Sequence, residues 1–252
     1  MGKVITFANH KGGVGKTTCV FNVASGFAAR RRKTLIIDLD PQSNLTVGAG
    51  VYDQVENSVY DLLTDEKNAQ ECIIERKKNL HIIGSSLDLS AAEIELSSKI
   101  GREKILYKKL QPVIEHYDLI IIDSPPSLGL LTVNALTAST NIFIPVQTEF
   151  YALHGLAKFI SVINEIKHEI NPDLEISGVI ATRFDKRKIL NREVIESIKE
   201  FFGDKLLKTI IRENISIAES PERGEDIFTY EPNSYGAEDF KALVKEIMKI
   251  LK

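Results

Sequence analysis

A glycine-rich loop near the N-terminus carries the residue types that hold a phosphate chain. Residues 11–18 read Lys-Gly-Gly-Val-Gly-Lys-Thr-Thr, between an apolar run and a segment with helical periodicity. Glycines let the backbone curl and direct successive N–H groups at an anion, and the first turn of the next helix adds its dipole. Lys16 can reach the β- and γ-phosphates, and the Thr17 hydroxyl can ligate Mg²⁺. The predicted nucleotide-binding residues are Lys11, Gly12, Gly13, Val14, Gly15, Lys16, Thr17 and Thr18.

The loop departs from the common spacing of such motifs. The pattern G-x-x-x-x-G-K-[ST] places its first glycine at position 10, which is His10 in this chain. A second lysine, Lys11, stands at the start of the loop instead, which is the deviant form of the motif. From the spacing alone, Lys11 is either a functional cation or a solvated surface lysine.

Two aspartates follow strongly apolar runs and are candidates for metal and acid–base chemistry. Asp123 ends the run Leu-Ile-Ile-Ile-Asp, the pattern of a carboxylate that holds Mg²⁺ directly or through water. Asp40 lies just beyond a second apolar run and could orient or deprotonate an attacking water, while Asp38 is better read as structural. A strand-end aspartate alone is often only a helix cap. Two of them beside a phosphate-binding loop favour a Mg-nucleotide site.

The elements that must position these residues alternate between buried strands and helices. Expected strands cover 3–8, 34–38, 80–83, 119–123, 141–146, 176–182 and a last short segment, 208–211. Expected helices cover 17–31, 102–116, 154–168, 192–202 and 235–251, and 65–78 reads as polar and short-helical. Continuous apolar strands that alternate with helices indicate an α/β fold, a doubly wound, mostly parallel sheet covered on both faces. We expect one domain over residues 1–252, with ligands at the carboxyl ends of the strands.

Composition narrows the class of protein further. The 252 residues are 43% hydrophobic, with 32 basic against 35 acidic residues and a net charge of −3. Any nucleic-acid binding must therefore use a local basic patch. Cys19 and Cys72 fit no metal or redox spacing, which favours a reducing, cytoplasmic setting. No apolar run has membrane-spanning length, so we expect no membrane partner.

The three motifs together resemble those of the ParA/Soj chromosome- and plasmid-partitioning ATPases. The matching segments are Lys-Gly-Gly-Val-Gly-Lys-Thr-Thr at 11–18, Ile-Asp-Leu-Asp-Pro-Gln at 37–42 and Ile-Ile-Asp-Ser-Pro-Pro at 121–126, with further matches at 127–136, 145–153 and 234–238. The resemblance covers nearly the whole chain. No helix-turn-helix region precedes the first strand, so the chain resembles the small Soj-like form of the family.

The resemblance implies a nucleotide-driven switch. In this family two subunits bound to ATP and Mg²⁺ close face to face as a homodimer, and the first lysine of the loop, here Lys11, crosses to the partner's phosphates. The ATP-bound dimer binds double-stranded DNA without sequence preference, which implies association with the nucleoid. A ParB-like protein stimulates slow hydrolysis and releases the DNA. On this basis Lys11, Lys16 and Asp40 are the predicted catalytic residues, with Thr17 and Asp123 at the metal.

The segment expected to bind DNA departs from the family pattern. Family members often carry arginines in the stretch matching 212–221, where this chain has Glu213 and Ser216. A nearby basic segment is the alternative candidate, with Arg212 and Arg223 as secondary candidates. A solvated loop is the competing interpretation, since charge runs often do nothing specific. The predicted DNA-binding residues are Arg183, Lys186, Arg187, Lys188 and Arg192.

Three other classes of protein fit the sequence less well, and the first of them is the main alternative. A MinD-like membrane-cycling ATPase shares the deviant loop but needs a membrane-binding amphipathic tail, and the apolar stripe of 235–251 is also explained by a packed helix. An iron–sulfur ATPase needs cysteines that Cys19 and Cys72 do not supply. A DNA-binding scaffold without turnover has no need of Lys16, Asp40 and Asp123.

Overall fold

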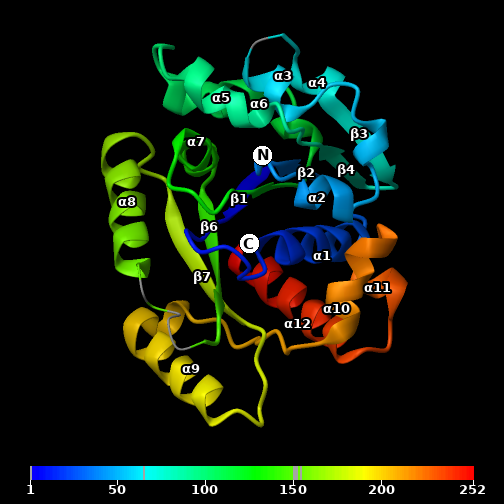
Figure 1. The fold of residues 1–252 in the computed structure, drawn as a ribbon, viewed down its shortest axis with the longest axis vertical. Helices are drawn as coiled ribbons and strands as arrows, with labels where there is room; N and C mark the ends of the chain where they lie inside the picture. Colours follow the sequence, from blue (N-terminus) through cyan, green and yellow to red (C-terminus); the bar gives the residue numbers. More distant parts are fainter. Residues whose placement is uncertain (1, 65, 150–152, 154) are drawn as a thin grey trace.

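The computed structural model describes residues 2–64, 66–149, 153 and 155–252, and a seven-stranded sheet organises them (Figure 1). The strands lie in the order β3-β4-β2-β5-β1-β6-β7. Six strands are parallel, and β3 at one edge pairs antiparallel with β4. The strands are β1 Lys3–Phe7, β2 Thr34–Asp38, β3 Ile73–Lys77, β4 Leu80–Ile83, β5 Leu119–Asp123, β6 Asn141–Gln147 and β7 Glu175–Thr182.

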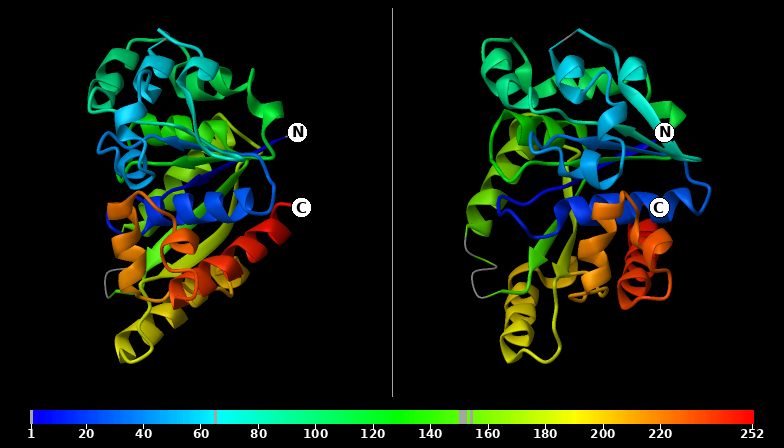
Figure 2. Two further views of the ribbon diagram at one scale, coloured as in Figure 1. Left: turned by 90° about the vertical axis from the view of Figure 1, so that its right-hand side faces the viewer. Right: turned by 45° about the vertical axis from the view of Figure 1, so that its right-hand side comes forward.

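Helices cover both faces of this sheet (Figure 2). On one face, alternate strand residues such as Ile5 and Ile121 pack against α1 and α12. On the other face, Val4 and Ile120 pack against α3, α5, α6 and α7, and further along the sheet β6 and β7 pack against α8 and α9. The helices are α1 Lys16–Ala28, α2 Asn44–Gly48, α3 Val59–Leu63, α4 Ala69–Cys72, α5 Leu89–Leu96, α6 Ile105–Leu110, α7 Leu130–Ala138, α8 Leu156–Glu169, α9 Ile189–Phe202, α10 Ile215–Glu219, α11 Ile227–Tyr230 and α12 Tyr235–Ile250. The predicted doubly wound α/β fold is confirmed.

The register of the central strands brings the candidate site together. Phe7 at the end of β1 lies opposite Asp123 of β5, and Asp38 at the end of β2 lies opposite the same aspartate. Because parallel strands end at the same edge of a sheet, the glycine-rich loop and both aspartate-bearing segments leave the sheet at one place.

Three predicted elements are wrong. Segment 65–78 holds the short helix α4 and then the antiparallel edge strand β3, which the polar sequence concealed. Segment 102–116 is not one helix: α6 ends at Leu110, because Pro112 cannot continue it, and short 3₁₀ turns flank α6. Segment 208–211 forms no strand; its neighbours Leu206 and Arg212 make only isolated bridges.

Helix α12 accounts for the apolar stripe near the C-terminus. Phe240, Leu243, Val244 and Ile247 are fully buried and pack in the cluster that includes α1. The packed-helix interpretation is therefore confirmed, and these side chains are not available to a bilayer. None of the helices in the described part of the chain is long and apolar enough to cross a membrane. The predicted start of α8 at His154 lies outside the described residues.

Candidate nucleotide-binding site

The glycine-rich loop connects β1 to α1 and has the backbone that an anion site needs. Gly13 and Gly15 have φ angles of 74° and 89°, in the left-handed region that side chains rarely adopt. Gly12 is not in this region, and a Cβ built there meets only the Pro126 side chain at 4.0 Å. No side chain caps the N-terminus of α1, so its first-turn N–H groups face the loop without a side-chain acceptor. The loop residues 11–18 lie together as the sequence predicts.

Two buried side chains brace this loop, and the sequence analysis missed both. The Asn9 amide donates to the carbonyl of Pro145 at 2.7 Å, while its oxygen accepts from the Lys11 N–H at 3.0 Å. From the far edge of the sheet, the Thr182 hydroxyl donates to the Val14 carbonyl at 2.8 Å. These bonds tie the loop to β6 and β7. The sequence offered only a weak signal, since polar residues at strand ends are common.

Lys16 lies beneath the loop and not on the surface. Its side chain is buried, and Nζ donates to the Lys11 carbonyl at 3.1 Å. Burial lowers the pKa of Lys16, although the nearby carboxylates of Asp123 and Asp40 oppose that shift. The structure therefore brings the predicted lysine and both predicted carboxylates into one cluster.

The Asp123 carboxylate lies in surroundings that disfavour its charge. The residue is fully buried, and neither carboxylate oxygen has a hydrogen-bond partner in the described part of the chain. Burial, followed by repulsion from Asp38, raises the pKa of Asp123 well above its usual value; the Thr17 hydroxyl, which is near Asp123 without making a well-formed hydrogen bond to it, and Lys16 oppose this shift. A buried carboxylate without a donor is a group that a divalent cation would stabilise. Asp123 and Thr17 therefore fit a Mg²⁺ ion.

The two aspartates after β2 have different surroundings. Asp38 accepts hydrogen bonds from the Thr46 hydroxyl at 2.7 Å, the Thr46 N–H at 2.9 Å and the Asp40 N–H at 3.1 Å. Burial raises the pKa of Asp38 to about 6, partly offset by these bonds. Asp38 thus holds the segment after β2 in place, which is the structural role expected from the sequence. Asp40 accepts from the Gln42 N–H at 3.0 Å, and its carbonyl accepts from Ser85 at 2.8 Å, so its position is fixed beside Lys16.

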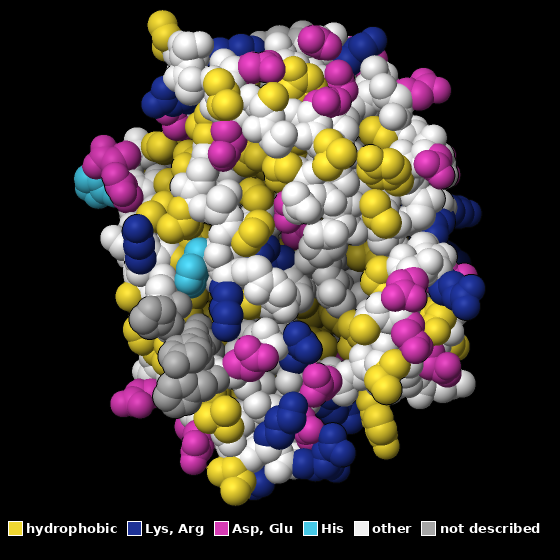
Figure 3. Space-filling model, in the orientation of Figure 1, with side chains coloured by type: hydrophobic (Ala, Val, Ile, Leu, Met, Phe, Trp, Pro, Cys, Tyr) yellow, Lys and Arg dark blue, Asp and Glu magenta, His cyan; other side chains and the backbone are white. Residues whose placement is uncertain are grey.

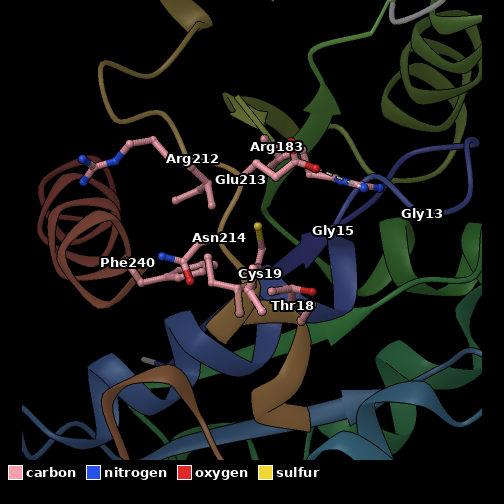
Figure 4. A pocket seen from close by; sticks show the side chains of 14 residues that line it. Gly13, Gly15, Thr18, Cys19, Arg183, Arg212, Glu213, Asn214 and Phe240 are labelled. Atoms are coloured by element: carbon pink, nitrogen blue, oxygen red, sulfur yellow. Dashed lines mark ion pairs between the residues drawn. The ribbon is translucent and has the colours of Figure 1, made fainter. Parts of the chain in front are cut away.

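A cavity of about 400 Å³ opens beside the loop (Figure 4). Gly13, Gly15 and Thr18 form one wall. The opposite wall comes from segment 211–218 and from Phe240, which the sequence analysis did not connect with the loop. Arg183 and Glu213 form an ion pair at this cavity, while Arg212 points the other way, towards α12 (Figure 4).

Lys11 has an intramolecular partner in this structure. Its Nζ lies 3.8 Å from Oε2 of Glu149, which follows β6, and both side chains are partly exposed. An exposed pair at this distance is weak, so the lysine remains available to another partner.

The predicted DNA-binding residues lie together after the carboxyl end of β7, but carboxylates neutralise several of them. The Arg187 guanidinium donates to both oxygens of Asp185, which holds the pKa of that carboxyl well below its usual range. Arg183 and Lys188 both pair with Glu213. Arg192 lies on the exposed side of α9.

The two secondary candidates differ in position, and Arg212 borders the basic loop, since it lines a pocket together with Lys186. Arg212 is held by Asp239 and Glu238 of α12. Arg223 lies in the short turn before α11. Arg212 therefore lies beside the predicted patch, but the carboxylates of α12 neutralise its charge.

A glycine-rich loop over a buried lysine and two carboxylates, at the carboxyl edge of a parallel sheet, defines a P-loop nucleotide-binding protein. A family model described as an AAA domain matches residues 2–176. The chain is 45% identical over 249 residues to the sporulation initiation inhibitor protein Soj of Bacillus subtilis, and the match covers 98% of each chain.

Solved structures with a bound nucleotide share the fold of this chain. The cobyrinic acid a,c-diamide synthase from Mycobacterium smegmatis, with bound ADP and magnesium, is 29% identical with a TM-score of 0.87, over 99% of this chain and 95% of that one. A plasmid partition protein from Borrelia burgdorferi, bound to AMPPNP, is 27% identical with a TM-score of 0.81, over 100% of this chain and 98% of that one. The chain belongs to the ParA/Soj family of partitioning ATPases.

Proposed function

We propose that this protein is a Mg-ATP-dependent switch that dimerises, binds DNA and drives the segregation of a chromosome or plasmid. The observation that carries the proposal is the cluster of Lys16, Asp40 and Asp123 beneath the glycine-rich loop. The 45% identity to Soj supports the partitioning role.

The nucleotide would be held by two adjoining features. The triphosphate lies along the loop amides with Lys16, and the adenosine enters the cavity lined by Thr18, Asn214 and Ile217. Thr17 and Asp123 would hold Mg²⁺, which would stabilise the negative charge of the phosphates. In the described ranges, no group of three or more His, Cys, Asp or Glu residues is placed to hold a metal ion without further ligands.

Hydrolysis in this proposal requires a second subunit. Asp40 orients the attacking water beside the phosphates, and its fixed position suits that task. Lys11 exchanges its weak contact with Glu149 for the partner's phosphates and so supplies positive charge to the transition state. The Gly12 surface accepts the approach of the partner, since it carries no side chain.

The DNA-binding surface would be the basic loop of Arg183, Lys186, Arg187 and Lys188, with Arg192 beside it. The net charge of the chain is −3, so DNA binding depends on this local patch. Dimerisation doubles the patch, and ATP is therefore required for DNA binding because it is required for dimerisation. A ParB-like protein stimulates hydrolysis and returns the protein to the monomer, in a cytoplasmic cycle on and off the nucleoid. All of this occurs within one domain spanning residues 1–252.

Phosphate release, measured with and without duplex DNA and a ParB-like protein, tests the proposal. We expect slow turnover by the protein alone and stimulation only when both partners are present. The matched control is Lys16→Ala, which should abolish turnover in every mixture. An absence of ATP hydrolysis by the unmodified chain in all mixtures would refute the switch. Hydrolysis stimulated by anionic liposomes and not by DNA would instead indicate a membrane-cycling ATPase.

A further inference from the structure

Glu213 lies between two cations of the basic loop. Its Oε1 atom is 3.5 Å from Nη2 of Arg183, and its Oε2 atom is 3.2 Å from Nζ of Lys188. All three side chains are about half exposed, so both pairs are open to solvent, and the pair with Arg183 also borders the cavity described above. One carboxylate therefore competes with any polyanion for two cations.

The backbone fixes residue 213 beside this loop, whatever its side chain is. The Phe184 N–H donates to the Ile211 carbonyl at 3.1 Å, and the Glu213 N–H donates to the Phe184 carbonyl at 3.0 Å. Phe184 and Arg212 form a parallel bridge. A substitution at position 213 thus changes the charge of the surface without moving the chain.

The loop has fewer available cations than its sequence indicates. Of Arg183, Lys186, Arg187, Lys188 and Arg192, three face a carboxylate, and Glu213 accounts for two of these. Within the described residues, Lys186 and Arg192 make no ion pair within 4.0 Å. In Figure 3 acidic side chains lie among the Lys and Arg side chains at the lower end of the molecule, near α9.

We propose that Glu213 is an electrostatic brake that weakens the binding of duplex DNA by this chain. The inference rests on the DNA-binding role proposed above. By pairing with Arg183 and Lys188, the carboxylate reduces the number of phosphates that each subunit neutralises. The protein therefore binds DNA more weakly, and releases it more readily, than a chain with a neutral residue at this position.

Glu213→Gln tests the brake, because it keeps the shape of the side chain and removes its charge. We expect binding to a duplex in Mg-ATP to tighten by roughly fivefold for each subunit, the effect of one exposed ion pair. The log–log salt slope should steepen by about 0.9 for each phosphate newly contacted. The matched control is Glu115→Gln, an exposed glutamate just before β5, at the amino ends of the parallel strands, whereas the basic loop follows the carboxyl end of β7. It makes the same change in net charge and should leave the affinity and slope unchanged.

The outcomes separate this inference from the proposed function. Unchanged or weaker DNA binding by Glu213→Gln, with normal DNA binding by the unmodified protein, would overturn the brake alone. Absence of ATP-dependent DNA binding by both proteins would overturn the DNA-binding role and the brake with it. Binding by Glu213→Gln only would support both.

A second substitution tests the same pairing, and its measurement in the unmodified background does not depend on the folding of Glu213→Gln. Lys188→Gln removes a cation that Glu213 already neutralises. In a chain that keeps Glu213, this change should therefore weaken DNA binding less than twofold. In the Glu213→Gln background the same change should cost roughly fivefold. A large loss in the unmodified background would contradict the proposal.

Discussion

Replacing Asp123 by Asn should stabilise the nucleotide-free protein while removing its response to magnesium. The carboxylate is fully buried, has no hydrogen-bond partner in the described structure and lies near Asp38. A buried polar group left unpaired costs about 1–3 kcal/mol, and more if it is charged. Asn keeps the shape and the polarity and removes only the charge, so we expect the free energy of unfolding to rise near pH 7, by about 1.4 kcal/mol for each unit by which burial raises the pKa of Asp123, up to pH 7.

The gain should depend on pH in a defined direction. Because burial raises the pKa of Asp123 in the folded protein, the folded state binds its proton more tightly than the unfolded chain does. Wild-type stability therefore falls as the pH rises above the unfolded value of about 4, by at most about 1.4 kcal/mol per pH unit. The Asn variant loses this dependence, so its advantage should be absent below pH 4 and grow above it.

Urea unfolding without nucleotide, at several pH values, measures this gain. Asp173→Asn, in the exposed turn before β7, is the matched control and should change stability little. Titrations of ATP with and without Mg²⁺ then measure the functional cost: the metal should strengthen nucleotide binding by the wild type and not by Asp123→Asn. A nucleotide-free variant less stable than wild type, or one with the wild-type magnesium response, would refute this account of Asp123.

Three further predictions concern the loop. Lys16→Ala should abolish tight ATP binding, since the loop amides alone do not offset the triphosphate charge; unchanged affinity in a calorimetric titration would contradict the site. Gly12→Val should fold and bind ATP normally, because a Cβ meets only Pro126 at 4.0 Å, yet remain monomeric by size-exclusion chromatography; an ATP-dependent dimer would count against face-to-face closure. Asn9→Ala leaves the buried Pro145 carbonyl and the partly buried Lys11 N–H without this partner. It should lower stability by about 2 kcal/mol and weaken ATP binding, measured by thermal unfolding with and without nucleotide. Unaltered stability would show that Asn9 does not brace the loop.

The sequence was sufficient to predict an element where its local pattern and its tertiary environment agree. The runs ending at Asp38 and Asp123 are apolar throughout, and they form central strands buried on both faces. The glycine loop was equally clear, since Gly13 and Gly15 require positive φ angles. Pro112 carried a signal that was present but overlooked, and it ends α6.

Other features depend on contacts between distant segments. Edge strand β3 is half polar, and it forms because it pairs with β4 while Arg76 donates to the Gly224 carbonyl at 2.6 Å. The braces from Asn9 and Thr182 cross between strands far apart in the chain. The contact of Glu213 with the basic loop likewise depends on packing that no local pattern encodes. The cations were visible in the sequence, but their neutralisation was not.

The most direct test of the proposed switch is sedimentation velocity of Asp40→Ala with a fluorescent duplex. If Asp40 serves the attacking water, the variant binds Mg-ATP but hydrolyses little, and so accumulates in the closed state. The account predicts a dimer that sediments with DNA in Mg-ATP, and a monomer free of DNA in Mg-ADP. A monomer in both nucleotides, or a dimer that leaves the duplex unbound, would contradict it.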